Sequence, residues 1–283
     1  MSNPVYLYHL PKHSGRSRLH GSHTFEAKCA AGDKSTATAW LVATETLKGP
    51  EETAYDEFVH VMEGLLENTK VVIKLQEGTS LSEREAAVAT QFRNRPANNV
   101  VIPICEFKCR HDLLHWMQPI RMREPFCTGG DTLLSVFVME HIPYNLAEYF
   151  EEHSNNEQAL RSCLKQLGFA LAELHFVHGM SHGDIGSGNI MLDIDTPKTN
   201  IYTIAGHQYS VDTHGFEPIL IDFQRSVKYR RACVDAGAAA DEIVLAYEFI
   251  ARWCGKRDSM APVLVRLSEV DTMEGLLDII QKL

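Results

Sequence analysis

Two segments of the sequence place polar side chains beside short apolar runs, and this arrangement constrains the fold more than any other feature. Residues 182–192 read His-Gly-Asp-Ile-Gly-Ser-Gly-Asn-Ile-Met-Leu, and residues 218–223 read Pro-Ile-Leu-Ile-Asp-Phe. The apolar run in each segment predicts a short strand. Asn189 comes directly before the first strand, five positions after Asp184, and Asp222 comes directly after the second. We therefore expect these three side chains to meet where the strands end.

The chemistry of these side chains fits a metal-dependent reaction. Mg²⁺ prefers carboxylate and carbonyl oxygen ligands and keeps water or substrate phosphate as its other ligands. Asn189 and Asp222 are therefore suitable metal ligands, which leaves Asp184 as the base that orients a hydroxyl. The Asp-x-x-x-x-Asn spacing alone also fits a loop acid and a turn asparagine.

A lysine interrupts an apolar strand further upstream. Residues 71–75 read Val-Val-Ile-Lys-Leu, and burying the ammonium group of Lys74 without a partner would be costly. The following helix offers Glu83 or Glu85, and we prefer Glu85 because the apolar residues of that helix place it on the buried side. A purely structural salt bridge would satisfy the same pattern.

Hydrophobic periodicity predicts a chain of class α+β, with a strand-rich front half and a mainly helical back half. We expect strands at residues 37–44, 71–75, 100–107, 113–120, 133–140, 190–192 and 219–221. Helical periodicity marks residues 53–68, 82–92, 159–175 and 238–253. Residues 195–215 are polar and contain Pro197, Gly206 and Gly215, which predicts a loop or hairpin between the last two strands.

Taken together, these segments resemble the protein kinase-like superfamily over residues 32–253. The parts that match the family, in its order, are Lys74, Glu85, Asp184, Asn189 and Asp222-Phe223. They resemble the lysine that holds the ATP phosphates, its helical partner, the catalytic-loop Asp and Asn, and the start of D-F-G. The resemblance implies ATP with Mg²⁺ or Mn²⁺ as cofactors. It also implies catalytic roles for Lys74, Glu85 and Asp184, and metal binding by Asn189 and Asp222.

The resemblance further implies a bilobal fold. Residues 1–31 would form an arm and a first strand, and residues 32–140 a β-rich N-lobe with a helical insertion near 50–69. Residues 141–283 would form a shortened, mainly helical C-lobe with an insertion near 195–215.

Two other segments resemble the parts of the family that bind nucleotide. Residues 32–40 resemble a phosphate-cradling loop, although they contain a single glycine. The expected contacts of that loop with ATP are Gly32, Lys34, Ser35 and Ala37. Residues 137–142 resemble the interlobe hinge, with Met139 as gatekeeper and the backbone of Glu140 and Ile142 as adenine contacts. Asp241 resembles the structural Asp that opens a conserved C-lobe helix.

The sequence also departs from the family in ways that bear on regulation. Gly183 replaces the Arg that receives an activating phosphate in many protein kinases, which argues against activation by phosphorylation. Gly186 replaces a Lys that meets the γ-phosphate, and Gln224 replaces the Gly of D-F-G. There is no A-P-E motif, and only 60 residues (283 − 223) follow Phe223. A reduced peptide-docking platform is expected.

The acceptor of the phosphate is the main open question. His-Gly-Asp without A-P-E is similar to atypical protein kinases such as the RIO kinases and to aminoglycoside and choline phosphotransferases. The small-molecule enzymes insert a large helical region between hinge and catalytic loop, whereas Glu140 and Asp184 are only 44 positions apart (184 − 140). We therefore favour a Ser/Thr protein kinase with a protein substrate. A small-molecule kinase and a nucleotide-binding pseudokinase are the alternatives, and the short form is also similar to kinases of large DNA viruses.

Composition excludes several other classes of function. The net charge of −10, from 27 basic and 37 acidic residues, disfavours broad nucleic-acid binding, although the basic segment 12–28 could dock an acidic partner. No apolar stretch is long enough to span a membrane, and the N-terminus does not resemble a secretory signal. Seven cysteines without a C-x-x-C pair suit a reducing compartment, so we expect an intracellular protein, cytoplasmic or nuclear.

One alternative metal site is weak on geometric grounds. It would consist of four residues of metal-binding type in a short span, Cys105, Cys109, His111 and His115. An extended strand would spread these residues over roughly 30 Å, so we do not expect zinc. His175, His178 and His182 are expected to be packing and turn residues.

Overall fold

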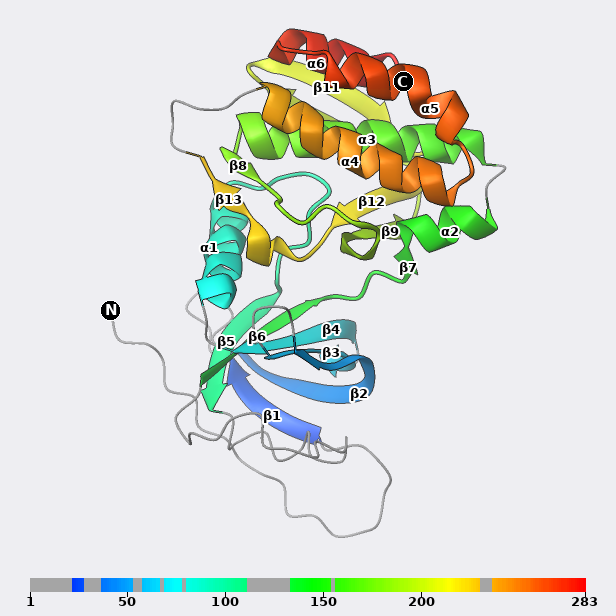
Figure 1. Ribbon diagram of the computed structural model, residues 1–283. Coiled ribbons are helices and arrows are strands. Elements are labelled where there is room, and N and C mark those ends of the chain that lie inside the picture. Colours follow the sequence, from blue (N-terminus) through cyan, green and yellow to red (C-terminus); the bar gives the residue numbers. More distant parts are fainter. Residues whose placement is uncertain are drawn as a thin grey trace. The chain divides into compact units, whose positions relative to one another are not determined.

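The computed structural model describes residues 22–27, 37–52, 58–66, 69–77, 80–110, 133–153, 156–229 and 236–283 (Figure 1). The chain mixes helices and strands, as the sequence predicts. It divides into two compact units. Unit 1 comprises Met1–Ala89 and Ile102–His141, and unit 2 comprises Thr90–Val101 and Ile142–Leu283.

Unit 1 contains a six-stranded antiparallel sheet with the strand order β1-β2-β3-β4-β6-β5. Its strands are β1 (Ser22–Ala27), β2 (Ala37–Glu52), β3 (Phe58–Leu66), β4 (Thr69–Glu77), β5 (Cys105–Arg110) and β6 (Leu133–Glu140). Val71, Ile73 and Leu75 of β4 are fully buried, and the intervening Lys74 is buried as well. Because successive side chains point to opposite faces, this strand is covered on both faces of the sheet.

The helix expected at residues 53–68, and with it the helical insertion near 50–69, is wrong. The described part of this segment is β3, which pairs with β2 on one side and with β4 on the other. The register with β4 is continuous from Val59, opposite Gln76, to Leu66, opposite Thr69. In so short a segment, apolar residues fit the helical period as well as the strand period. Pairing with both β2 and β4 makes this segment a strand.

Two other expected strands differ from the structure or lie outside it. The strand expected at residues 100–107 begins only at Cys105, while Val100 forms an isolated parallel bridge with Leu220. Pro103 lies between these points and has no N–H to donate to a strand partner. The strand expected at residues 113–120 lies outside the described residues.

The helix that follows β4 is amphipathic, as expected. α1 (Ser80–Asn94) buries Ser82, Glu85, Ala89 and Phe92. These positions recur every three or four residues and therefore share one face. Glu85 lies on this face among apolar neighbours, so its carboxylate needs a partner.

Unit 2 is mainly helical. Its helices are α2 (Leu146–Glu152), α3 (Glu157–Phe176), α4 (Ala236–Trp253), α5 (Arg257–Ser268) and α6 (Met273–Gln281). α3 and α4 confirm the helices expected at 159–175 and 238–253. In Figure 1, α4 lies across α3, and α5 and α6 lie against this pair. Asparagine side chains cap the first turns of α2 and α3, because Asn145 accepts from Ala147 N and Asn156 accepts from Ala159 N.

Unit 2 also contains several short strands. β7 (Tyr144–Asn145), β9 (Ile190–Ile194) and β12 (Phe216–Leu220) form one sheet in the order β12-β9-β7. β8 (Met180–Ser181) pairs with β13 (Val227–Lys228). The expected hairpin is β10 (Thr199–Ile204) with β11 (His207–Asp212). Its two turn residues, Ala205 and Gly206, both have positive φ, as the common two-residue hairpin turn requires.

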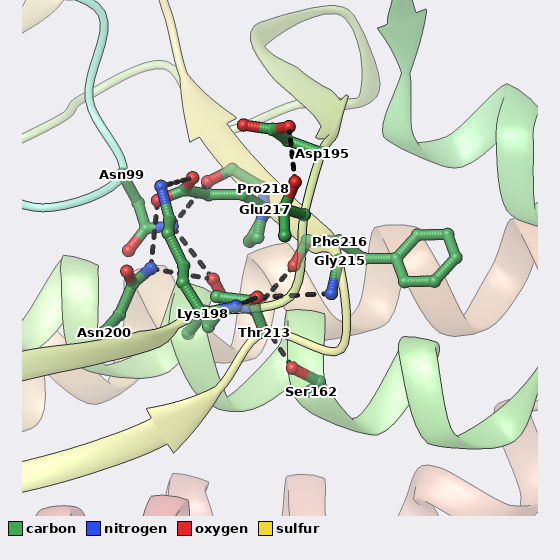
Figure 2. A network of polar contacts seen from close by, with 12 residues as sticks. Asn99, Ser162, Asp195, Lys198, Asn200, Thr213, Gly215, Phe216, Glu217 and Pro218 are labelled. Carbon is green, nitrogen blue, oxygen red and sulfur yellow. Dashed lines mark hydrogen bonds and ion pairs between the residues drawn. The ribbon is translucent and has the colours of Figure 1, made fainter.

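A buried polar network fastens this hairpin to the rest of unit 2. Figure 2 shows the buried Asn99 and Asn200, and the exposed Lys198 at the edge of the network, converging on the segment around Glu217 and Pro218. At the centre is Gln166 of α3, which is fully buried. Its Oε1 accepts from Asn99 and Asn200, and its Nε2 donates to Ser162 Oγ and to the carbonyl of Phe216. The sequence does not predict this network, because its members are far apart in the chain.

No helix in the described part of the chain is both long enough and apolar enough to cross a membrane.

We predict that Gln166→Leu lowers the free energy of unfolding by about 3 kcal/mol, because it leaves buried N–H and C=O groups without a partner. Gln158→Leu, at an exposed position of the same helix, should change it by less than about 0.5 kcal/mol. Chemical denaturation of both variants measures the difference. Equal stabilities would show that the network contributes nothing to folding.

Candidate functional site

Lys74 and Glu85 form a buried ion pair within unit 1. Lys74 belongs to β4, which pairs with β3 on one side and with β6 on the other. It lies opposite Val61 of β3 and Phe137 of β6. Its Nζ donates to Oε2 of Glu85 in α1 at 2.8 Å, and both residues are buried. Glu83 is exposed, which decides between the two partners that the sequence offers. Removing either partner alone would leave an uncompensated buried charge.

Asn189 and Asp222 lie at the same end of a strand pair within unit 2. β9 begins directly after Asn189, and β12 ends two residues before Asp222. The two strands are antiparallel, with Ile190 opposite Leu220. The N–H of Ile221 donates to the carbonyl of Asn189 at 3.1 Å. This bond holds the backbone beside Asp222 against Asn189.

Asp184 lies next to Asn189 in the loop between β8 and β9. Nδ2 of Asn189 donates to the backbone carbonyl of Asp184 at 2.8 Å and to its Oδ2 at 3.2 Å. Nη1 of Arg225 donates to the other carboxylate oxygen, Oδ1, also at 3.2 Å. The Asp184 side chain remains 31% exposed. The loop therefore presents an accessible carboxylate in one fixed orientation, which is what a general base needs.

Asp222 adopts a left-handed backbone conformation, with φ 66° and ψ 70°. For a residue other than glycine this conformation costs about 1–3 kcal/mol, and it persists only where the surrounding structure fixes it. Here β12 precedes Asp222, and the short helix η4 (Phe223–Arg225) follows it. Phe223 is buried and packs edge-on against Phe92, with ring centroids 5.1 Å apart. Such strain at a carboxylate is typical of functional positions.

The donor atoms of this cluster suit a hard cation. The amide nitrogen of Asn189 is directed at Asp184, so its Oδ1 and the Asp222 carboxylate offer the oxygen ligands that Mg²⁺ prefers. Across the described ranges, no three His, Cys, Asp or Glu side chains gather closely enough to hold a metal ion alone. A cation at this point would therefore draw further ligands from water and substrate phosphate.

The remaining expected nucleotide contacts are placed as follows. Gly32, Lys34 and Ser35 lie outside the described residues, and Ala37 is the first residue of β2. Met139 and Glu140 end β6, Met139 being buried and Glu140 exposed. Ile142 follows them as the first residue of the larger part of unit 2.

Of the histidines expected to be packing and turn residues, His178 packs against an aromatic ring. His178 is buried and its ring packs edge-on against Phe92, with centroids 5.3 Å apart. Burial, assisted by the positive charge of Arg95, lowers the pKa of His178 to about 4. Of the alternative zinc residues, Cys105 and Cys109 belong to β5, and His111 and His115 lie outside the described residues.

A buried carboxylate, Glu242 of α4, holds the loop that carries Asp184. Its Oε2 accepts from the N–H of His182 at 3.1 Å, and its Oε1 accepts from the N–H of Gly183 at 2.7 Å. Nε2 of His175 lies 2.8 Å from the same carboxylate, and the hydroxyl of Tyr229 lies 3.0 Å from Nδ1 of His175. Since a carboxylate can only accept, Nε2 of His175 donates to Glu242.

The assignment of Asp241 as the structural acid is therefore wrong. Asp241 is exposed, and α4 begins five residues before it, at Ala236. Glu242 takes that place because it lies on the buried face of α4, with Ala239 and Ala246 one turn away on either side. An acid on the apolar face of a helix was the available sequence signal.

The hydrogen bonds of His182 show that it is neutral. The carbonyl of Ile221 can only accept, so Nε2 of His182 donates to it at 2.9 Å, and Nδ1 accepts from the N–H of Asp184 at 3.3 Å. Burial lowers the pKa of His182, although Glu242 opposes the shift. His182 thus ties the segment before Asp222 to the backbone of Asp184 without adding charge.

Sequence comparison gives no family and no curated relative from which these roles could be transferred. No protein-family model matches the chain, and no curated protein sequence matches it.

We predict that Glu242→Gln destabilises the protein by about 3 kcal/mol near neutral pH, because it removes charge-assisted hydrogen bonds. Burial raises the pKa of Glu242, but hydrogen bonds from His175, Gly183 and His182 outweigh it, and the pKa is lowered overall. Because the pKa of Glu242 is lower in the folded than in the unfolded protein, its ionised form stabilises the fold. This stabilisation is present above the unfolded-state pKa and is lost as the pH falls through the folded-state pKa.

The advantage of the wild type over Glu242→Gln should therefore shrink as the pH falls below 4.5, the ordinary glutamate value. Denaturation at a series of pH values measures it. Glu248→Gln, exposed on the same helix, is the control. A gap that stays constant through the acid range would contradict the assignment.

Proposed function

We propose that the protein is an ATP-dependent phosphotransferase with a bilobal protein kinase-like fold, and that it transfers the γ-phosphate of ATP to a Ser or Thr hydroxyl of a protein. The cluster of Asp184, Asn189 and Asp222 at the ends of two paired strands is the observation that carries the proposal. The boundary between the units after His141 falls within the segment that resembles the kinase hinge, which supports the two-lobe interpretation.

Asp184 is the proposed base of the reaction. It accepts a hydrogen bond from the substrate hydroxyl and takes its proton as the hydroxyl oxygen bonds to the γ-phosphorus. The bond from that phosphorus to the β–γ bridging oxygen breaks, and its electron pair leaves with ADP. Asn189 keeps the carboxylate oriented, since its amide bonds both the backbone and the side chain of Asp184.

Two further groups deal with the charge of the phosphates. In unit 1, Lys74, which is fixed by Glu85, is the proposed phosphate-binding residue. Asn189 and Asp222 would hold Mg²⁺, which neutralises phosphate charge when bound. Catalysis then comes mainly from positioning and electrostatics rather than from covalent chemistry.

A protein acceptor is supported by the short connection between β6 and Asp184. The elements described between them are β7, α2, α3 and β8. α2 and α3 bury apolar side chains in the core of unit 2. No large helical substrate-binding insertion is found in this part of the described chain.

Radiolabelled ATP tests the function directly. Purified protein is incubated with Mg²⁺, labelled ATP and, separately, a generic protein, a peptide library, and a panel of aminoglycosides and choline. We expect label in Ser or Thr of protein or peptide. Label confined to a small alcohol would identify a small-molecule kinase, and nucleotide binding without transfer to any acceptor would identify a pseudokinase.

The roles of the two acids can be separated by kinetics. Asp184→Asn should leave Mg²⁺-ATP affinity within a few-fold and lower turnover by about 10²–10⁴. Asp222→Asn removes a metal ligand, so it should also raise the Mg²⁺ concentration required for activity. Asp193→Asn, on β9 and outside the cluster, is the matched control. Near-native turnover of Asp184→Asn would contradict the assignment.

A further inference from the structure

The loop that carries Asp184 has no cation of its own. Residues 180–189 contain neither Lys nor Arg, and their one histidine, His182, is neutral in its hydrogen-bonded state. The phosphoryl group being transferred carries negative charge. Fixed positive groups close to the attacking oxygen stabilise this charge in the transition state. If the proposed function holds, a side-chain cation that adds to Lys74 and the metal ion beside Asp184 has to come from another segment.

Arg225 is the cation that reaches Asp184. Its Nη1 donates to Oδ1 of Asp184 at 3.2 Å, and its side chain is 41% exposed. A guanidinium carries five N–H donors in a planar fork. One such group can therefore contact a carboxylate and a phosphoryl oxygen at once. The ion pair itself is partly exposed, so its direct contribution to stability is small.

The backbone of Arg225 is clamped against the loop that carries Asp184. Ser226 donates from Oγ to the carbonyl of His182 at 3.2 Å, and Val227 pairs with Ser181. Gly183 has φ +80°, and a Cβ built on it would lie 2.3 Å from the carbonyl oxygen of Arg225. Only a glycine at position 183 leaves room for the carbonyl group of Arg225, because any side chain there would collide with it.

We propose that Arg225 is a catalytic residue that contacts the transferred phosphoryl group while it holds Asp184 in position. This role rests on the proposed phosphotransferase function. It supplies, from the segment after Asp222, the positive charge that Gly186 cannot supply from the loop.

Kinetics of Arg225→Gln test the proposal. Turnover should fall at least about 100-fold, as when one transition-state donor is lost, while the KM for ATP stays within a few-fold. Arg225→Lys should keep an intermediate turnover, because it retains the charge but not the fork. Arg266→Gln, at an exposed position of α5, is the control. A turnover of Arg225→Gln within threefold of wild type would overturn the role.

Moving the cation provides a second test. Gly186 has an extended backbone, with φ −162° and ψ 168°, and a Cβ at this position meets nothing within 4 Å. Gly186→Lys should therefore be tolerated and should restore turnover of Arg225→Gln at least tenfold. A double variant no more active than Arg225→Gln would overturn the proposal, because a merely structural defect is not repaired by a charge on the loop.

Binding measurements separate this proposal from the function on which it rests. Calorimetry compares Mg²⁺-ADP with Mg²⁺-ADP plus aluminium fluoride, which imitates the phosphoryl group in flight. Wild type should bind the second more tightly, and Arg225→Gln should lose at least tenfold of that gain while binding Mg²⁺-ADP normally. An unchanged gain would overturn the role of Arg225 alone. Absence of Mg²⁺-ADP binding to wild type would overturn the proposed function and this role together.

Discussion

The arrangement of unit 2 depends on one buried carboxylate. Glu242 accepts hydrogen bonds from the backbone N–H groups of His182 and Gly183 and from the ring of His175. A buried carboxylate without these donors would be strongly unfavourable, and the loop N–H groups would be left unpaired without it. The carboxylate on α4 therefore needs the hydrogen-bond donors of α3 and of the loop before Asp184, and these donors need the carboxylate.

The same loop explains why position 183 is a glycine. Its N–H bonds Glu242 on one side, and its missing side chain lets the carbonyl of Arg225 approach on the other. The guanidinium of Arg225 then reaches Asp184. The Asp184 carboxylate is thus positioned by contacts within unit 2.

Sequence reasoning identified the parts whose signal is local. Lys74 in an apolar strand required a partner, and Glu85 on the buried helix face provides it. The predictions were wrong where contacts between distant segments determine the local structure. β3 is a strand because β2 and β4 pair with it, and Glu242 rather than Asp241 anchors the loop because of the direction in which α4 presents it. Arg225 could not be placed from its spacing, since no periodicity links it to Asp184.

Calorimetric titration of the protein with Mg²⁺-ATP, combined with its melting temperature, tests nucleotide binding most directly. A phosphotransferase of this kind should bind one nucleotide per chain. At about one hundred times the dissociation constant, we also expect roughly 2.7 kcal/mol of added stability and a higher melting temperature. If neither ATP nor ADP, with Mg²⁺ or Mn²⁺, gives heat of binding or raises the melting temperature, the protein is not a nucleotide-dependent phosphotransferase.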